Sequence, residues 1–197
     1  MKCIWAVFLL ASDVRGADVT LWTTGDDIVS TFVRFAATEQ ATRMFAAIGV
    51  RLQWKTHRRV NPDDGMAIQV RFTTDMPGHP GALAFANPFD PVPVVMVMYN
   101  RLFFATERVP EVRVSLLAHV LAHEIGHLIM RTDEHSPAGI MKAHWSGAEC
   151  ARMAHLPLTF LPEDADVIRR GLITRARGVE RAAGVEPGSN RSRELNR

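Results

Sequence analysis

The strongest constraint on this chain is the motif His123-Glu124-Ile125-Gly126-His127, which lies inside a long apolar segment. Residues four apart share one face of an α-helix, and their side chains lie roughly 6 Å apart. His123 and His127 can therefore bind one metal ion, with Glu124 on the same turn. Neutral imidazole suits Zn²⁺, and a catalytic zinc site combines three protein ligands with one water. Zinc lowers the pKa of that water and a carboxylate can take its proton, so the motif indicates metal-assisted hydrolysis of peptide bonds.

The residues around the motif predict that it is helical. Apolar residues recur with a helical period at Val112, Leu116, Leu117, Val120, Leu121, Ile125 and Leu128. Pro110 and Glu111 stand where a helix start favours proline and acid. The alternative is a buried helix whose histidines are satisfied core residues. Buried histidine and glutamate need partners, and one metal site would provide them for all three motif side chains.

The remaining histidines carry weaker arguments. His119 lies one turn before the motif on the same face, and we expect it to be packed or hydrogen-bonded rather than a ligand. His144 follows Met141 closely enough to line a cleft. No spacing argument applies to His57, His79 and His155.

The segment 123–141 resembles the metzincin zinc endopeptidases. It is most similar to small bacterial and archaeal members in which a His-Ser-Pro-x-Gly-(Ile/Val)-Met run follows the active-site helix; here the run is residues 135–141. The resemblance implies a single catalytic Zn²⁺ with a protein or peptide substrate. It also implies that Glu124 is the general base and that Met141 lies in a tight turn under the metal. The three implied zinc ligands are His123, His127 and His135.

The spacing departs from the usual metzincin pattern, which has glycine three residues and the third ligand six residues after the second histidine. Met130 and Asp133 occupy those positions here. A methionine cannot cheaply adopt the left-handed conformation that ends such a helix. We therefore expect a slightly longer helix, a wider turn and His135, not Asp133, as the third ligand. Some metzincins stabilise the oxyanion with a tyrosine after the turn methionine; this chain has His144 or Trp145 there, and the choice stays open.

The preceding sequence predicts an α+β domain. Strands are expected at 19–22, 50–54, 68–72 and 94–99, because apolar residues alternate or run together there. Asp26 or Asp27 would cap a long helix. Its predicted buried stripe is Ile28, Phe32, Phe35, Ala36, Met44, Phe45 and Ile48.

This order of elements is that of the metzincin N-terminal subdomain. The resemblance implies a zincin-like fold: a twisted mixed sheet with a short antiparallel edge strand, a long backing helix, an active-site helix, a Met-turn and a C-terminal helix. Extended substrates pair with that edge strand, which here would be Ala82, Leu83, Ala84, Phe85 and Ala86. The flanking prolines and glycines equally fit an edge protected against aggregation.

Three regions are expected along the chain. Residues 1–17 combine a basic start with a short apolar run, as in a signal peptide; the alternative is a buried N-terminal strand of a cytoplasmic protein. Residues 18–173 form the catalytic domain, whose last helix opens at Pro162 and ends near 171–175. Residues 174–197, rich in arginine and poor in large apolar residues, resemble a disordered basic tail. We expect an exported protein, periplasmic or secreted, if the leader is cleaved, and otherwise a cytoplasmic one.

Composition and charge limit the classes of molecule that the protein is expected to bind. An apolar share of 47% with 22% charged residues fits one globular domain, and a net charge of +2 indicates neither nucleic acid nor an anionic membrane as partner. No later segment is expected to span a membrane. If residues 1–17 are cleaved, Cys3 is lost with them, and Cys150 has no partner for an internal disulfide.

The sequence therefore predicts a zinc-dependent endopeptidase. The alternatives are a zinc-binding protein without useful turnover, or a cytoplasmic protease acting on one regulatory protein.

Overall fold

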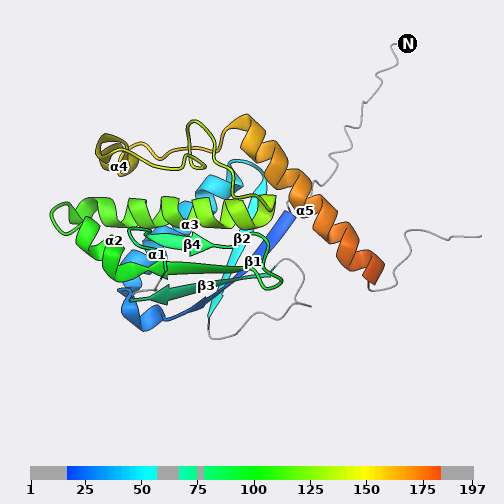
Figure 1. Ribbon diagram of the computed structural model, residues 1–197, viewed down its shortest axis with the longest axis horizontal. Coiled ribbons are helices and arrows are strands. Elements are labelled where there is room, and N and C mark those ends of the chain that lie inside the picture. The colour runs from blue at the N-terminus through cyan, green and yellow to red at the C-terminus, as the bar shows by residue number, and fades with distance from the viewer. Residues whose placement is uncertain (1–16, 57–66, 75–77, 183–197) are drawn as a thin grey trace, which may run out of the picture.

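The computed structural model describes the backbone of residues 17–56, 67–74 and 78–182 (Figure 1). Within these residues the strands form one mixed sheet in the order β2-β1-β3-β5-β4. The strands β1 (Ala17–Thr24), β2 (Val50–Thr56), β3 (Ala67–Thr73) and β5 (Val94–Met98) run parallel. The short β4 (Ala84–Ala86) is antiparallel to β5 and lies at the edge. The predicted α+β class and the short antiparallel edge strand are confirmed.

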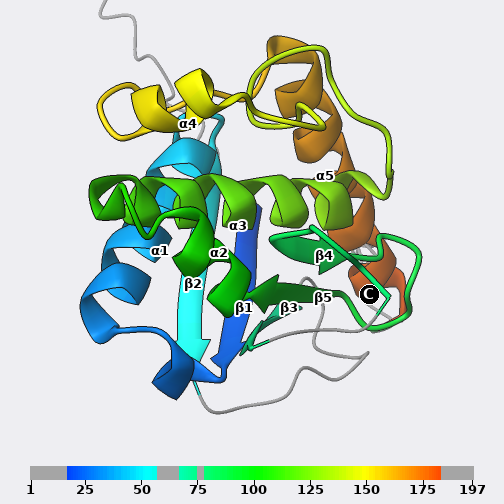
Figure 2. The ribbon, with the colours of Figure 1, turned by 60° about the vertical axis from the view of Figure 1, so that its left-hand side comes forward.

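Helices α1 (Thr31–Ala46) and α3 (Arg113–Met130) pack against each other and cross the sheet (Figure 2). Strand β1 shows why: Val19 and Leu21 are fully buried, whereas Thr20 between them is not. This period of two turns one apolar face of the sheet towards the helices. Shorter helices, α2 (Tyr99–Ala105) and α4 (Gly147–Met153), precede and follow α3, and α5 (Pro162–Ala182) packs beside it.

The first helix differs from the prediction in its start and in its buried face. It begins after Ser30, whose Oγ accepts a hydrogen bond from the backbone N–H of Val33 at 3.3 Å, and not after Asp26 or Asp27, which lie in a preceding 3₁₀ turn. Phe32 and Phe35 are 74% and 63% exposed. The buried residues are instead Ala37, Thr38, Ala41, Met44 and Phe45. Small alanines on this face let α1 approach α3 closely, which phenylalanines there would prevent.

The last helix is longer than predicted. It continues to Ala182, so residues 174–182 are helical rather than a tail, and residues 183–197 lie outside the described part, as do residues 1–16 of the expected leader. Gly171, which suggested a helix end, serves a different purpose. A Cβ atom there would lie 2.6 Å from the carbonyl oxygen of Ile129, so this glycine lets α5 approach α3.

Helix α3, with the short turn before it, lies in the core of the protein. By length and composition the stretch Pro110–Met130 could cross a membrane, contrary to the expectation that no segment could. Of its most apolar window, however, 78% is buried inside the protein. Such a stretch fits the core helix of a folded domain.

The end of α3 explains how the chain leaves the helix without glycine. The helix stops at Met130, and Arg131 adopts the left-handed conformation with φ 55° and ψ 47°. Because its Cβ crowds the backbone there, this conformation costs an L-residue roughly 1–2 kcal/mol. The helix exit is therefore left-handed, unlike the wider turn expected from the missing glycine, and the residue that forms it is an exposed arginine one position further along.

We predict that Arg131→Gly raises the free energy of unfolding by about 0.5–1 kcal/mol. Glycine removes the steric cost of the left-handed conformation, but it also loses more conformational entropy on folding, which offsets part of this gain. Urea denaturation measures this change. Arg131→Ala is the control: it loses the same side chain but keeps Cβ, and its stability should stay near that of the wild type. Equal stability of the glycine and alanine variants would contradict the prediction.

Candidate metal centre

Three histidines converge at the end of α3. The Nε2 atoms of His123 and His127 lie 3.0 Å apart. The ring of His135, from the following loop, has its centroid 5.3 Å from that of His123 and 4.8 Å from that of His127. One ligand atom of each residue lies within 4.8 Å of the others. The three residues chosen from the sequence are therefore close enough to hold one metal ion.

The hydrogen bonds of the two helix histidines prepare them for a metal. His123 Nδ1 lies 2.8 Å from the carbonyl oxygen of Ile140, and His127 Nδ1 lies 2.8 Å from that of Thr132. A carbonyl oxygen only accepts, so each Nδ1 must carry the hydrogen, which leaves a lone pair on each Nε2. Two lone pairs 3.0 Å apart repel each other unless a cation lies between them. This donor set fits a metal ion.

The electrostatics favour the same state. Burial lowers the pKa of His123 to about 4, and burial also lowers the pKa of His127. Both rings are therefore neutral near pH 7, which is the form that binds metals.

The turn that supplies the Ile140 carbonyl is closely packed. Gly139 has φ 74°, and a Cβ there would lie 2.5 Å from the carbonyl oxygen of Thr159. The same Thr159 oxygen accepts a hydrogen bond from the N–H of Ile140 at 3.0 Å. Met141 is fully buried, and its sulfur would lie 2.7 Å from a Cβ on Gly126. The glycine inside the helix motif is therefore what lets the methionine turn close against α3.

Glu124 lies beside the histidines and is only half-buried. Burial raises the pKa of its carboxyl group to about 7, although a hydrogen bond from the backbone N–H of Ala86 favours the charged form. A group with this pKa can both take up and release a proton near neutral pH. The contact with β4 could not be inferred from the sequence, because it depends on how the edge strand meets α3.

A cleft of about 930 Å³ opens over Glu124, His123 and His135. One wall is the approach to β4, including Ala82, Leu83 and Ala84 of the predicted edge segment. Only Ala84–Ala86 of that segment is a strand, and Phe85 stacks on His79 with ring centroids 3.9 Å apart. The floor is α3, and the opposite wall is formed by residues 142–151.

The other candidates have defined positions. Asp133 is exposed and does not belong to the histidine cluster. His119 is fully buried; its Nδ1 donates to the carbonyl oxygen of Ser115 at 2.6 Å, and its Nε2 accepts from the N–H of Leu158 at 2.9 Å. It is hydrogen-bonded as expected.

Tyr99 begins α2, outside the cleft lining, and Trp145 Nε1 donates to the carbonyl oxygen of Gly139 at 3.2 Å. His57 lies outside the described residues.

Asp164 is a site residue that sequence reasoning missed. It lies in the first turn of α5 and is only 7% exposed. Its Oδ1 accepts a hydrogen bond from the hydroxyl of Ser136 at 2.6 Å, and its Oδ2 has no hydrogen-bond partner in the described part of the chain. Because Ser136 follows His135, this contact fixes the loop of the third histidine to α5. The sequence predicted only that a helix opens at Pro162, and nothing in it singled out Asp164.

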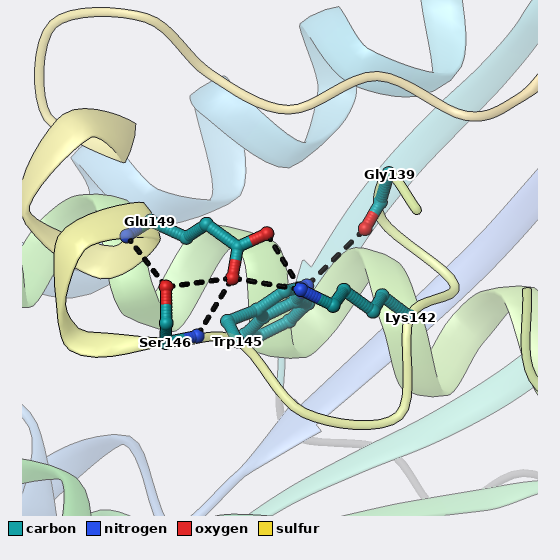
Figure 3. A network of polar contacts seen from close by, with 5 residues as sticks. All are labelled: Gly139, Lys142, Trp145, Ser146 and Glu149. Carbon is teal, nitrogen blue, oxygen red and sulfur yellow. Dashed lines mark hydrogen bonds and ion pairs between the residues drawn. The ribbon is translucent and has the colours of Figure 1, made fainter. Parts of the chain in front are cut away.

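The loop after Met141 is held by a polar network (Figure 3). The ammonium group of Lys142 contacts both carboxylate oxygens of Glu149 at 2.8 and 2.9 Å. Glu149 also accepts hydrogen bonds from the N–H and hydroxyl of Ser146, the residue that caps α4. The hydrogen bonds from Lys142 and Ser146 lower the pKa of Glu149 to about 2, so its carboxylate is ionised at neutral pH.

Comparison with family models and with curated proteins finds no match to this sequence.

We predict that His135, and not Asp133, is the third metal ligand. His135→Ala should weaken zinc binding by far more than the roughly 10–100-fold that follows loss of a residue outside the ligand set. Asp133→Ala should change zinc binding by less than tenfold, because its exposed carboxylate is not in the histidine cluster. Competition with a chromophoric chelator measures both. Loss of zinc from the Asp133 variant together with its retention by the His135 variant would reverse the assignment.

Proposed function

We propose that this chain is a zinc-dependent endopeptidase with Glu124 as its general base. The observation that carries the proposal is that three imidazoles converge, those of His123 and His135 line the cleft, and Glu124, with a carboxyl pKa of about 7, lines the same cleft. Imidazole nitrogens suit Zn²⁺, and three protein ligands leave a fourth position open, as in catalytic zinc sites.

The chain's own residues account for the proton transfers. Zinc held by the three histidines would supply Lewis-acid activation of water and of a carbonyl group. Glu124 lies next to His123 and takes a proton from the attacking water, then gives it to the nitrogen of the leaving amine. The N–H of Ala86 orients the Glu124 carboxylate for both steps.

The edge strand supports a peptide as substrate. The carbonyl oxygen of Leu83 accepts a hydrogen bond from the N–H of Met98 at 2.9 Å, so Leu83 faces β5. Backbone groups alternate along an antiparallel strand, and those of Ala84 therefore point away from β5. Ala84 also lines the cleft. An extended peptide can pair with this edge and pass over Glu124.

His144 is the side chain best suited to stabilise the oxyanion. Other donors of the cleft are already engaged: Thr106 donates to the carbonyl oxygen of Leu102 at 2.9 Å, Lys142 binds Glu149, and Trp145 binds Gly139. His144 is exposed in the same cleft, and no hydrogen bond of its side chain to the described residues is found. For the role that the sequence left open between His144 and Trp145, we therefore propose His144.

The first test is Glu124→Gln. The amide is nearly isosteric with the carboxyl group but cannot act as a base, so cleavage of fluorescent casein should fall about 10²-fold or more while the zinc content stays at one ion per chain. Asp133→Asn is the matched control and should keep its activity. A zinc-binding protein without turnover would show no cleavage in the wild type; activity of Glu124→Gln within a few-fold of the wild type would exclude the mechanism.

The second test is His144→Ala. Loss of one donor to an oxyanion lowers kcat by about 10²–10³-fold in rigid sites, and we expect about tenfold or more here because His144 is exposed. Zinc affinity should not change. His155→Ala, which removes an exposed histidine outside the cleft lining, is the control. An unchanged kcat would remove His144 from the mechanism.

A further inference from the structure

The cleft wall that carries His144 has little packing of its own. In the segment 143–148, between Lys142 and Glu149, only Trp145 is half-buried, and the other residues are exposed. Ala143, His144, Trp145 and Gly147 nevertheless line the cleft. Of these side chains only that of Trp145 packs against the hydrophobic core, so the position of the rest of the segment must depend on polar contacts.

Polar contacts hold it at its ends and in its middle. Lys142 and Glu149 join its two ends through the paired 2.8 and 2.9 Å contacts, and Glu149 also accepts the N–H of Ser146 at 2.7 Å (Figure 3). In the middle, the N–H of the Trp145 indole is bonded to Gly139, and the indole ring stands edge-on to the ring of His123, with centroids 5.6 Å apart.

We propose that Lys142 and Glu149 are positioning residues: their ion pair is a latch that closes the segment 143–148 and so holds His144 in the cleft beside the metal ligands. Isolated surface ion pairs contribute little. Here the ammonium group contacts both carboxylate oxygens, and the same carboxylate accepts the N–H of Ser146 in the capping box of α4, so the ion pair and the start of α4 depend on one charge. The catalytic part of this inference rests on the proposed function, whereas the latch itself does not.

The latch is tested by amide hydrogen exchange of the zinc-loaded full chain. In Lys142→Met and in Glu149→Gln, exchange in 143–148 should become about fivefold faster or more, while α3 keeps its protection. Lys142→Arg should restore the wild-type rate, because arginine can make the same paired contact. Arg51→Met, which removes an exposed ion pair with Asp18 on strand β2, is the control and should not affect the segment. Unchanged exchange in both latch variants would overturn the proposal.

The positioning of His144 is tested by kinetics. Lys142→Met and Glu149→Gln should each lower kcat about fivefold, with KM and zinc affinity within twofold of the wild type. In a His144→Ala background neither change should lower kcat further, because the group that they position is gone. If either change lowers kcat further in the His144→Ala background, the two residues do not act by positioning His144. If Lys142→Met lowers kcat and Glu149→Gln does not, that role is also overturned, and Lys142 contacts the substrate directly. If the wild type cleaves nothing, the proposed function fails while the exchange experiment still decides the latch.

Discussion

The structure depends on one constraint: α3 is buried on nearly all sides, and it carries three histidines. A buried polar nitrogen without a partner is costly, so every ring must be satisfied by what surrounds the helix. His119 finds both partners in the backbone. His123 and His127 each find one, at Ile140 and Thr132, and their second nitrogens are left facing each other. The same rule thus makes one histidine structural and leaves the other two close enough, with His135, to hold a metal ion.

The loop after α3 is shaped by these demands. Its carbonyl groups must reach back to the rings, and glycines at 126 and 139 remove the side chains that would block the approach. Ser136 and Asp164 then tie the loop to α5. The third histidine therefore reaches the pair on a segment anchored at several points, although His135 itself is exposed.

The two walls of the cleft are stabilised differently. The β4 wall belongs to the sheet and is also held by Arg101 of α2, which donates to the carbonyl oxygens of His79 and Ala82. The opposite wall is an exposed segment closed by Lys142 and Glu149. The wall formed by β4 suits pairing with the backbone of a peptide. The position of the other wall depends on one ion pair, so a single substitution can change its stability. Helix α3 joins the two, because Glu124 contacts Ala86 on one side and His123 contacts Trp145 on the other.

The sequence by itself determined the features that depend on local order. Periodicity predicted the strands and the helix around His123, and the spacing of four residues paired His123 with His127. The short edge strand and His135 as the third ligand were implied by the resemblance of the segment 123–141 to a known family. Sequence reasoning misjudged features that depend on neighbours: Phe32 and Phe35 looked like core residues, and Gly171 looked like a helix end. Only the tertiary structure decided these, because whether an apolar face is buried, or a glycine serves close approach, depends on the element packed against it. The Ala86–Glu124, Ser136–Asp164 and Lys142–Glu149 contacts belong to the same class, since hydrogen bonds between residues of different elements leave no periodic trace in a chain.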